Sequence, residues 1–529
     1  MDVAVINTGG TISCVGDPLA PMSAAEFAAA CTTILDPILA MQYPDLTVTY
    51  VTDLIFPESA TGTLDSTNLQ PTDWCRMATY ILAHYAQYDG WIILHGTDSM
   101  DFTGTALPFL LSSFASNGVG TAVLSKPVVI TGSQMPMFHQ TQDQGAITLN
   151  YNTDAYQNFC GAIAAAQSGV PEVCVYFDGN LFRGARVVKT NANQFDAFSS
   201  PNYPALGQYG IDFQIQSELL MPSPISYGVS LDNPQVCAAA LAQVKAIMAT
   251  INSVPVMQFN AFPAWYVIGT EGNPSSAYLA NLINACVFQG TAGLILESYG
   301  EGNFPSGDPD TPSNGAVYKA LQAANQNGVV IIDNTQVLQA VVNNSAYAAG
   351  AWLPEVGALS PVDMTPMASL AKLTVLLATA SHQGWTAPVV KTLMGLSLVG
   401  EMIEVSRLDS RRNATLLSGQ SIATSDGSAT LLNDPVVGPM LTDSNGNVLW
   451  KPLPAPLPAL MPGRLVMQND GNLVFFSRDN APMWATNTGN PAGASSMLVL
   501  SGSAATSTLS LVVYDYSGGF ISASLYAQS

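Results

Sequence analysis

Short apolar runs rich in β-branched residues alternate with longer amphipathic stretches along the first 215 residues. The stretches 23–39 and 71–85 predict helices. The apolar runs predict five strands, at 3–7, 47–52, 90–94, 127–131 and 172–177. Strands that alternate with helices are typical of a parallel sheet covered on both faces. Because ligands bind beyond the carboxyl ends of such strands, the turns after them are where chemistry is expected.

The same alternation returns after a proline-punctuated connector, 221–255, which carries one predicted helix at 234–251. Beyond it the pattern predicts strands at 265–269, 292–297 and 329–333 and helices at 275–288 and 315–327. We therefore expect an N-terminal α/β domain over 1–215, a connector over 216–255 and a second α/β domain over 256–405. Two or more domains also suit a chain of 529 residues, which is longer than one hydrophobic core usually organises.

The pattern changes after Arg412 to short strand-like runs separated by turn dipeptides, with few helix formers. Asp426-Gly427, Asn445-Gly446 and Asp470-Gly471 are turns of this kind, spaced roughly as in successive hairpins. This predicts an all-β module over 412–529, and the recurrence of the turns indicates internal repetition.

Composition excludes several classes of function. Apolar residues make up 48% of the chain and charged residues 10%, which excludes a disordered protein. The 15 basic and 37 acidic residues give a net charge of −22, which repels nucleic acid and anionic lipid, so neither is an expected partner. Longer apolar stretches such as 368–380 fall short of a membrane span, and the first residues lack a basic leader. The cytoplasm is thus favoured, with export by a signal-independent route as the alternative.

Cysteine and histidine usage argues against metal and disulfide chemistry. The seven cysteines form no CxxC pair, and none occurs after Cys286. The four histidines make no pair at a metal-ligand spacing. We expect neither a zinc site nor a disulfide framework.

Hydroxyl, carboxylate and amine groups follow three of the predicted strands. Thr8-Gly9-Gly10-Thr11 follows the first strand, where two glycines allow a sharp turn. His95-Gly96-Thr97-Asp98 follows the strand at 90–94, and Lys189 lies beyond the strand at 172–177. Each feature alone has an ordinary interpretation, as a turn or a solvated charge. Together, and in this order, they form a candidate site for nucleophilic catalysis.

These segments resemble the bacterial asparaginase family, in its cytoplasmic type I branch. Further stretches resemble that branch and extend the similarity to about residue 405: Leu64–Thr67, Thr131–Gln134, Arg186–Asn191, Phe195–Asn202, Ser298–Asn303 and Asp363–Thr365. The resemblance implies two α/β/α domains of the asparaginase type, doubly wound around mostly parallel sheets. It also implies an amidohydrolase that needs no metal or organic cofactor and assembles as a homodimer or homotetramer.

The resemblance further implies a role for each matching residue. Thr11 would be the nucleophile that attacks the side-chain amide of L-asparagine, and Thr97 with Lys189 would relay protons. Asp98 would bind the substrate ammonium. The substrate would also be held by Ser66 and Thr67 at its α-carboxylate and by Ser133 beside its amide.

One position departs from the family. The loop after Thr11 usually carries a tyrosine that helps to activate the nucleophile, and Leu19 stands at that place. A leucine can neither donate a hydrogen bond nor transfer a proton. Either another hydroxyl serves, or Thr97 and Lys189 suffice, or catalysis is slow.

The tail resembles a bulb-type mannose lectin, which implies a β-prism fold. Its segment Gln468–Phe476 is similar to the motif Q-x-D-x-N-x-V-x-Y, with phenylalanine at the last position. If the segment is one strand, alternation places Gln468, Asp470 and Asn472 on one face, with Val474 against a sugar ring and Phe476 in the tyrosine position. Trp450 and Trp484 are interpreted as core residues.

Two hypotheses follow from these patterns. The first is an asparaginase-like hydrolase with an appended lectin-like module that binds mannose-type glycans. The second is a glycan-binding protein whose asparaginase-like part is structural or weakly active, and Leu19 is the feature that supports it.

Overall fold

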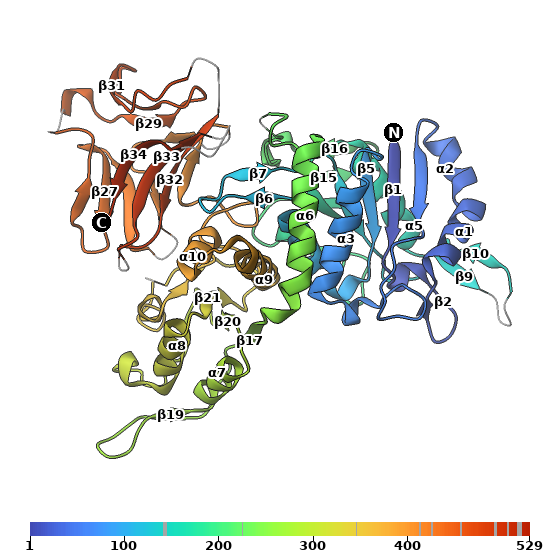
Figure 1. The fold of residues 1–529 in the computed structure, drawn as a ribbon, viewed down its shortest axis with the longest axis horizontal. Coiled ribbons are helices and arrows are strands. Elements are labelled where there is room, and N and C mark those ends of the chain that lie inside the picture. The colour runs from blue at the N-terminus through green and yellow to red at the C-terminus, as the bar shows by residue number, and fades with distance from the viewer. Residues whose placement is uncertain are drawn as a thin grey trace.

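The N-terminal α/β region is built around one eight-stranded sheet (Figure 1). The computed structural model describes residues 1–140, 145–224, 226–344, 346–411, 414–424, 427–454, 458–490, 495–504, 507–515 and 521–528. The five predicted strands are confirmed as β1 (Asp2–Asn7), β4 (Thr47–Val51), β5 (Gly90–Leu94), β8 (Val128–Thr131) and β11 (Val173–Phe177). They run parallel in the order β4-β1-β5-β8-β11. Three antiparallel strands extend the sheet: β12 (Asn180–Arg183), β15 (Gly207–Tyr209) and β16 (Phe213–Ile215).

Alternate residues of these strands face two separate cores. Ala4, Ile6 and Ile93 point to one face and Val3 and Val5 to the other, all of them buried. The first face is covered by α3 (Pro71–Ala83), α4 (Met100–Leu110) and α6 (Pro234–Thr250). The second face is covered by α1 (Ala24–Ile34), α2 (Asp36–Gln42) and α5 (Ala155–Gln167). The predicted doubly wound arrangement is confirmed for this sheet.

The single helix predicted over 23–39 is two helices. The chain bends by 53° between α1 and α2. Pro37, in the first turn of α2, cannot donate to the preceding turn, and its ring would collide with the carbonyl four residues earlier in a continuous helix. The helical spacing of apolar residues continues past this proline, so the sequence pattern predicted one helix where the structure has two.

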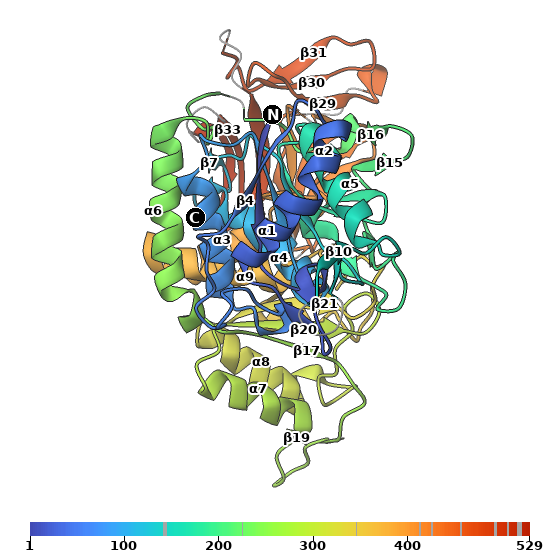
Figure 2. The same cartoon turned by 90° about the vertical axis from the view of Figure 1, so that its right-hand side faces the viewer.

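Helix α6 with the turn after it, residues 234–253, is long and apolar enough to cross a membrane by length and composition. It packs against α3 and α9 (Pro366–Gln383) along the side of the molecule (Figure 2). Cys237, Ala240, Val244 and Ile247 on its inner face belong to the core. These contacts account for the buried face of the helix, which makes up 28% of its apolar window.

The second α/β region has a four-stranded parallel sheet in the order β17-β20-β21-β22. Its strands are β17 (Val256–Asn260), β20 (Gly293–Ser298), β21 (Val330–Thr335) and β22 (Ala358–Leu359). Helices α7 (Tyr278–Phe288) and α8 (Ala316–Gln326) cover one face, and α9 with α10 (Ala387–Met394) covers the other. The strand predicted at 265–269 is not part of this sheet.

Only Tyr266–Val267 (β18) of that predicted strand is extended, and it pairs with Ser276–Ala277 (β19) in a hairpin that projects from the region (Figure 2). Trp265 and Val267 there are 61% and 46% exposed. The run is apolar without being buried, which is why its composition was misleading.

The C-terminal β region consists of three four-stranded antiparallel sheets around one core (Figure 1). The first contains β23 (Arg407–Asp409), β32 (Ser496–Ser501), β33 (Ser510–Asp515) and β34 (Ile521–Ala527). The second contains β24 (Thr415–Leu416), β29 (Arg464–Met467), β30 (Leu473–Phe476) and β31 (Pro482–Ala485). The third contains β25 (Ser421–Ala423), β26 (Ala429–Asp434), β27 (Gly438–Asp443) and β28 (Val448–Trp450).

Two tryptophans join the second and third of these sheets. Trp450 and Trp484 meet edge to face with ring centroids 5.7 Å apart, and both pack against the shared core. Their predicted structural role is confirmed. The β region begins with β23 at Arg407, a few residues before the predicted start at 412.

A buried ion pair joins the two α/β regions. Arg186 Nη1 lies 2.6 Å from Asp363 Oδ2, with the side chains 1% and 3% exposed. The guanidinium also donates to the Gly400 carbonyl at 2.7 Å, and Asn202 donates to the Asp363 carbonyl at 3.0 Å. Breaking a buried pair leaves an uncompensated charge, which makes this joint sensitive to the loss of either partner.

Replacing Arg186 with leucine should lower the free energy of unfolding by about 3–5 kcal/mol, because Asp363 would keep its burial and lose its counter-charge. The measurement is a urea-denaturation curve. Arg478→Leu is the control, since the Arg478–Asp479 pair is 55% and 68% exposed and exposed pairs contribute little. Equal denaturation midpoints for the two variants would contradict this account of the joint.

Candidate active site

The three turns that carry most of the predicted site meet at the carboxyl ends of β1, β5 and β8. Thr8 donates from its amide and hydroxyl to the Leu94 carbonyl at 2.9 and 3.0 Å. His95 N donates to the Thr131 carbonyl at 2.8 Å. The connection after β1 leads to β4 on one side, and the chain then returns to β5 on the other. The turns therefore lie at a topological switch point, where ligand sites of such sheets form.

Glycines let these turns approach one another more closely than side chains would allow. Gly9 and Gly10 have φ angles of 113° and 78°, in the region that favours glycine. A Cβ atom on Gly10 would lie 2.3 Å from Gly96 Cα, and one on Gly96 would lie 2.4 Å from Ser66 Oγ. Thr11 and Thr97, which follow these two glycines, thus start from backbone segments in direct contact.

Lys189 joins the second threonine to its neighbouring carboxylate. Its ammonium donates to Thr97 Oγ1 at 2.8 Å and to Asp98 Oδ1 at 2.7 Å. Thr97 is buried, and the Asp98 side chain is 56% exposed. Thr11 opens a short 3-10 turn, and its hydroxyl has no hydrogen-bond partner in the part of the chain that the structure describes. The cluster therefore offers a linked threonine, lysine and aspartate beside an unengaged hydroxyl.

Two contacts place Lys189 in this cluster. Its backbone belongs to β13 (Val188–Lys189), which pairs with β14 (Phe198–Ser199). Asp101 on α4 accepts a hydrogen bond from Lys189 N at 3.2 Å. Burial raises the pKa of Asp101 to about 6, while the hydrogen bonds that it accepts act in the opposite direction. Asp101 is a residue that sequence reasoning missed.

Helix α4 approaches this segment through two glycines. A Cβ atom on Gly104 would lie 2.8 Å from the Gly184 carbonyl oxygen. The close approach fixes the distance between α4 and the turn that leads to β13. Glycines at positions 104 and 184 could have signalled this packing, although neither stands beside a catalytic motif.

The predicted substrate-binding residues lie around the same strand ends. Ser66 and Thr67 form a 3-10 turn whose Thr67 amide and hydroxyl donate to Asp65 Oδ1 at 3.0 and 2.8 Å. Ser99 fixes this turn by donating to the Ser66 carbonyl at 2.7 Å. Ser133 follows β8 and is buried. No group of three metal-ligating side chains occurs among the described residues.

The turn that carries Ser133 is held by a buried carboxylate. Asp154 accepts hydrogen bonds from the Gln134 and Met135 amides at 2.8 and 3.2 Å. Burial raises the pKa of Asp154. Asp154 lies 21 positions beyond Ser133, and sequence reasoning did not associate the two residues.

Leu19 lies in the short hairpin formed by β2 (Cys14–Val15) and β3 (Ala20–Pro21). Its side chain is 54% exposed, which is unusual for leucine. An exposed leucine cannot supply the hydrogen bond that a tyrosine would provide in this loop.

The lectin-like segment is not one strand, so this part of the expectation was wrong. Strand β29 ends at Met467 and β30 begins at Leu473, and Gln468–Asn472 form the turn between them. Within the turn, Asp470 Oδ1 accepts the Asn472 amide at 3.0 Å. Thr486 donates to Asn472 Oδ1 at 3.1 Å. The Asp-Gly sequence favoured a turn at the point where strand alternation was assumed.

Alternation holds within β30 itself. Leu473 and Phe475 belong to the core of the β region. Val474 is buried outside that core, and the Phe476 ring lies under the Arg464 guanidinium at 4.9 Å.

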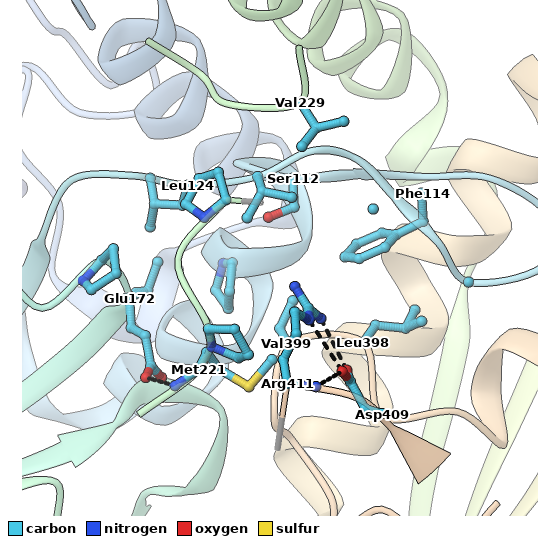
Figure 3. Close-up of a pocket in the computed structure, with 18 of the residues that line it drawn as sticks. Ser112, Phe114, Leu124, Glu172, Met221, Val229, Leu398, Val399, Asp409 and Arg411 are labelled. Carbon is cyan, nitrogen blue, oxygen red and sulfur yellow. Dashed lines mark hydrogen bonds and ion pairs between the residues drawn. The ribbon is translucent and has the colours of Figure 1, made fainter. Parts of the chain in front are cut away.

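A separate cavity of about 110 Å³ lies where the β region joins the α/β regions (Figure 3). Its walls include Phe114, Leu124, Val229 and Leu398, and Arg411 with Asp409 forms an ion pair on its rim. Thr11, Thr97 and Lys189 are not among its lining residues. The cavity therefore belongs to the joint and not to the strand-end cluster.

The fold and the strand-end cluster define an α/β protein with a threonine-centred polar site, and comparisons identify its family. The model of the asparaginase N-terminal domain matches residues 2–221, and that of the glutaminase/asparaginase C-terminal domain matches 277–384. L-asparaginase 1 of Escherichia coli K12 is 31% identical over 361 residues, which are 68% of this chain and 86% of that protein. The chain therefore belongs to the asparaginase family and is an L-asparaginase-like amidohydrolase.

Other relatives show the same core in different settings. The 60 kDa lysophospholipase of Homo sapiens is 31% identical over 361 residues, 68% of this chain but 52% of that protein. The crystal structure of L-asparaginase I from Vibrio cholerae superposes with a TM-score of 0.54 at 26% identity. The superposition covers 76% of this chain and 99% of the Vibrio cholerae chain. The asparaginase fold expected from the sequence is thus confirmed for the two α/β regions.

His95, in the second turn, should make stability fall in mild acid. It is fully buried between Thr103 and the Gly96 carbonyl, and burial lowers its pKa from 6.5 to about 4. Between these two pH values the unfolded chain binds a proton that the folded chain excludes, so stability is lost as pH falls. The loss is up to about 1.4 kcal/mol per pH unit.

The measurement compares denaturation midpoints from pH 7 to 4 for the wild type and His95→Gln, which cannot titrate. We expect a shallower decline for His95→Gln, and an unchanged decline for His382→Gln, because His382 is exposed. Identical pH profiles for all three proteins would refute the assignment of a buried neutral His95.

Proposed function

We propose that this chain hydrolyses L-asparagine to L-aspartate and ammonia, with Thr11 as nucleophile. The observation that carries the proposal is the placement of Lys189 Nζ between Thr97 Oγ1 and Asp98 Oδ1. An amine linked to a hydroxyl is a proton relay of the kind that activates nucleophilic threonines. The membership of the asparaginase family supports an amide as the substrate.

The reaction takes two steps. In the first, Thr11 Oγ attacks the amide carbon, the C–N bond breaks and ammonia leaves with the proton taken from the hydroxyl. In the second, water attacks the resulting ester, releases aspartate and restores the Thr11 hydroxyl. Thr97 accepts a hydrogen bond from Lys189, so its own O–H is available to donate toward the water or the amide.

Charge decides how the substrate binds. The Asp98 side chain is 56% exposed and contacts Lys189 through Oδ1, so its carboxylate is accessible as a counter-charge for the substrate ammonium. Ser66 provides a hydroxyl group for the α-carboxylate, and Thr67 joins it when its hydroxyl rotates away from Asp65. Thr97 and Ser133 flank the amide. Backbone N–H groups at these turns would stabilise the oxyanion.

Leu19 sets the rate we expect. Without a tyrosine in the loop, activation of Thr11 depends on Thr97 and Lys189, and turnover should be slower than with a loop hydroxyl. The alternative, a weakly active hydrolase whose main role is glycan binding, differs from this proposal in the amount of ammonia released. Location in the cytoplasm stays a prediction from the sequence.

Two variants test the proposed roles. Thr11→Ala should abolish ammonia release from L-asparagine, because the acyl-enzyme can no longer form. Lys189→Met should lower kcat/KM by about 10²–10⁴, the range typical of a lost proton-transfer group. Ammonia release is measured for asparagine, glutamine and other amides.

Lys319→Met is the matched control for Lys189→Met. Lys319 is an exposed lysine on α8, and its ammonium donates to the carbonyl of Asn314 in the turn before that helix. It should retain full activity. Normal turnover by Thr11→Ala would exclude Thr11 as nucleophile. Normal turnover by Lys189→Met would show that the ion pair of Lys189 with Asp98 has only a structural role.

We further propose that the chain forms at least a homodimer, on the basis of its family and the Ser298–Asn303 segment. Light scattering of the active enzyme should give at least twice the chain mass of 55.5 kDa. A fully active monomer at the assay concentration would contradict the proposal.

We also propose that the C-terminal β region is lectin-like and binds mannose-type glycans through the Gln468–Phe476 hairpin. Three four-stranded sheets around one core support a prism-like arrangement. Asp470 keeps one carboxylate oxygen beyond the bond to the Asn472 amide. Since Asn472 and Phe476 already have partners in Thr486 and Arg464, binding of one monosaccharide should be weak, with a Kd of about 1 mM.

A glycan array with the full chain tests this second proposal. Asp470→Ala should remove binding to mannose-rich glycans, because both the sugar acceptor and the turn acceptor are lost. Asp470→Asn is the control for the turn, since its amide oxygen can still accept the Asn472 amide. Binding that survives Asp470→Ala would place the sugar site elsewhere, and no binding by the wild type would leave the region without this role.

A further inference from the structure

A large cleft separates the second α/β region from the C-terminal β region. Its volume is about 740 Å³, within the range of small-molecule sites. One wall is formed by α10, the end of α8 and the segment 354–359. The other is formed by residues 424, 427–428, 444, 500–503 and 508 of the β region. Figure 1 shows α10 lying beside the β region. The cleft is distinct from the strand-end cluster and from the hairpin Gln468–Phe476.

Lys391 on α10 brings a positive charge into this cleft. Its ammonium donates to Asn325 Oδ1 at 2.7 Å and to the Gly357 carbonyl at 3.4 Å. Both partners are neutral, and no carboxylate of the described residues lies within ion-pair distance. Burial lowers the pKa of Lys391. By contrast, the deeply buried Lys372 and Arg186 each contact a carboxylate.

A half-buried cation with neutral partners only would gain from an anion. Partial burial costs solvation free energy, and two carbonyl dipoles offset less of it than a full negative charge does. A carboxylate or phosphate placed beside Nζ would supply that charge. Glu355 lines the same cleft and accepts a hydrogen bond from the Tyr318 hydroxyl at 3.1 Å. An anionic ligand is therefore expected at Lys391, which lies beyond ion-pair distance of this carboxylate.

The other residues that line the cleft indicate the chemistry of the rest of the ligand. Serine and threonine residues line the cleft from the β region, among them Ser444, Ser501 and Thr508. Apolar surface comes from the α/β side, including Leu359 and Pro388. Hydroxyl-bearing residues on one wall and apolar residues on the other suit a ring with one face of C–H bonds and an edge of hydroxyls.

We propose that this cleft binds a sugar acid, with the ligand carboxylate on Lys391 and its hydroxyls on the β-region loops. Such a ligand would touch both walls and hold the β region against the α/β regions. Because binding is independent of Thr11, this inference does not rest on the proposed hydrolysis.

Titration calorimetry of the full chain with D-glucuronate tests the proposal, with D-glucose as the neutral analogue and D-glucose 6-phosphate as the phosphate analogue. We expect saturable one-to-one binding of glucuronate, at least tenfold tighter than that of glucose. Lys391→Met should weaken glucuronate binding at least tenfold. Lys319→Met, an exposed lysine outside the cleft, should leave it unchanged.

Ala387→Trp is a second test that fills the cleft and leaves Lys391 in place. It should also weaken binding at least tenfold, while an unchanged urea-denaturation curve shows that the protein remains folded. The proposal is overturned if glucuronate does not bind saturably, if Lys391→Met and Ala387→Trp bind it like the wild type, or if glucose binds equally well. Tighter binding of the phosphate analogue would overturn the assignment to a sugar acid.

Discussion

The contact between Gly10 and Gly96 is the constraint on which the candidate site depends. At this point the backbones after β1 and β5 touch, with no room for a Cβ on either residue. Thr11 and Thr97 follow these glycines directly, so their positions are fixed by packed backbone and not by flexible side chains. Ser66 lies against Gly96 from the third side. Any side chain introduced here would separate the groups that the proposed chemistry needs together.

Lys189 reaches the same place by a longer structural route. Its position depends on the Gly104–Gly184 contact, on β13 and β14, and on Asp101, which accepts its backbone amide. Arg186, three residues earlier, is held by Asp363 of the second α/β region. The joint between the two regions and the placement of Lys189 thus depend on one short segment. A disturbance of the joint should be felt in the site.

The regular elements of the fold could be predicted because burial imposes periodicity. Strands β1, β5 and β11 are continuous apolar runs, as buried parallel strands should be, and their positions agree with the sequence pattern. The pattern failed at 265–269, where apolar residues are exposed, and across Pro37, where periodicity continued through a break. It also failed at Gln468–Asn472, where a turn interrupts the assumed strand.

The site could be predicted only in part, and for a physical reason. Residues beside recognisable turns, such as Thr11, Thr97 and Asp98, are visible in the sequence because glycines mark the turns. Asp101 and Asp154 act through backbone amides far from their own positions, and nothing local signals such a role. The cleft around Lys391 joins residues more than a hundred positions apart, so it emerges only from the packing of the β region.

The central claim is that Thr11 forms a covalent ester with the substrate acyl group. Acid quenching during turnover of L-asparagine, followed by peptide mass analysis, tests it most directly. The account predicts that the peptide containing Thr11 gains the mass of one aspartyl group, and that Thr11→Ala gains none. An aspartyl group on the peptide containing Thr97, or turnover by Thr11→Ala, would contradict it.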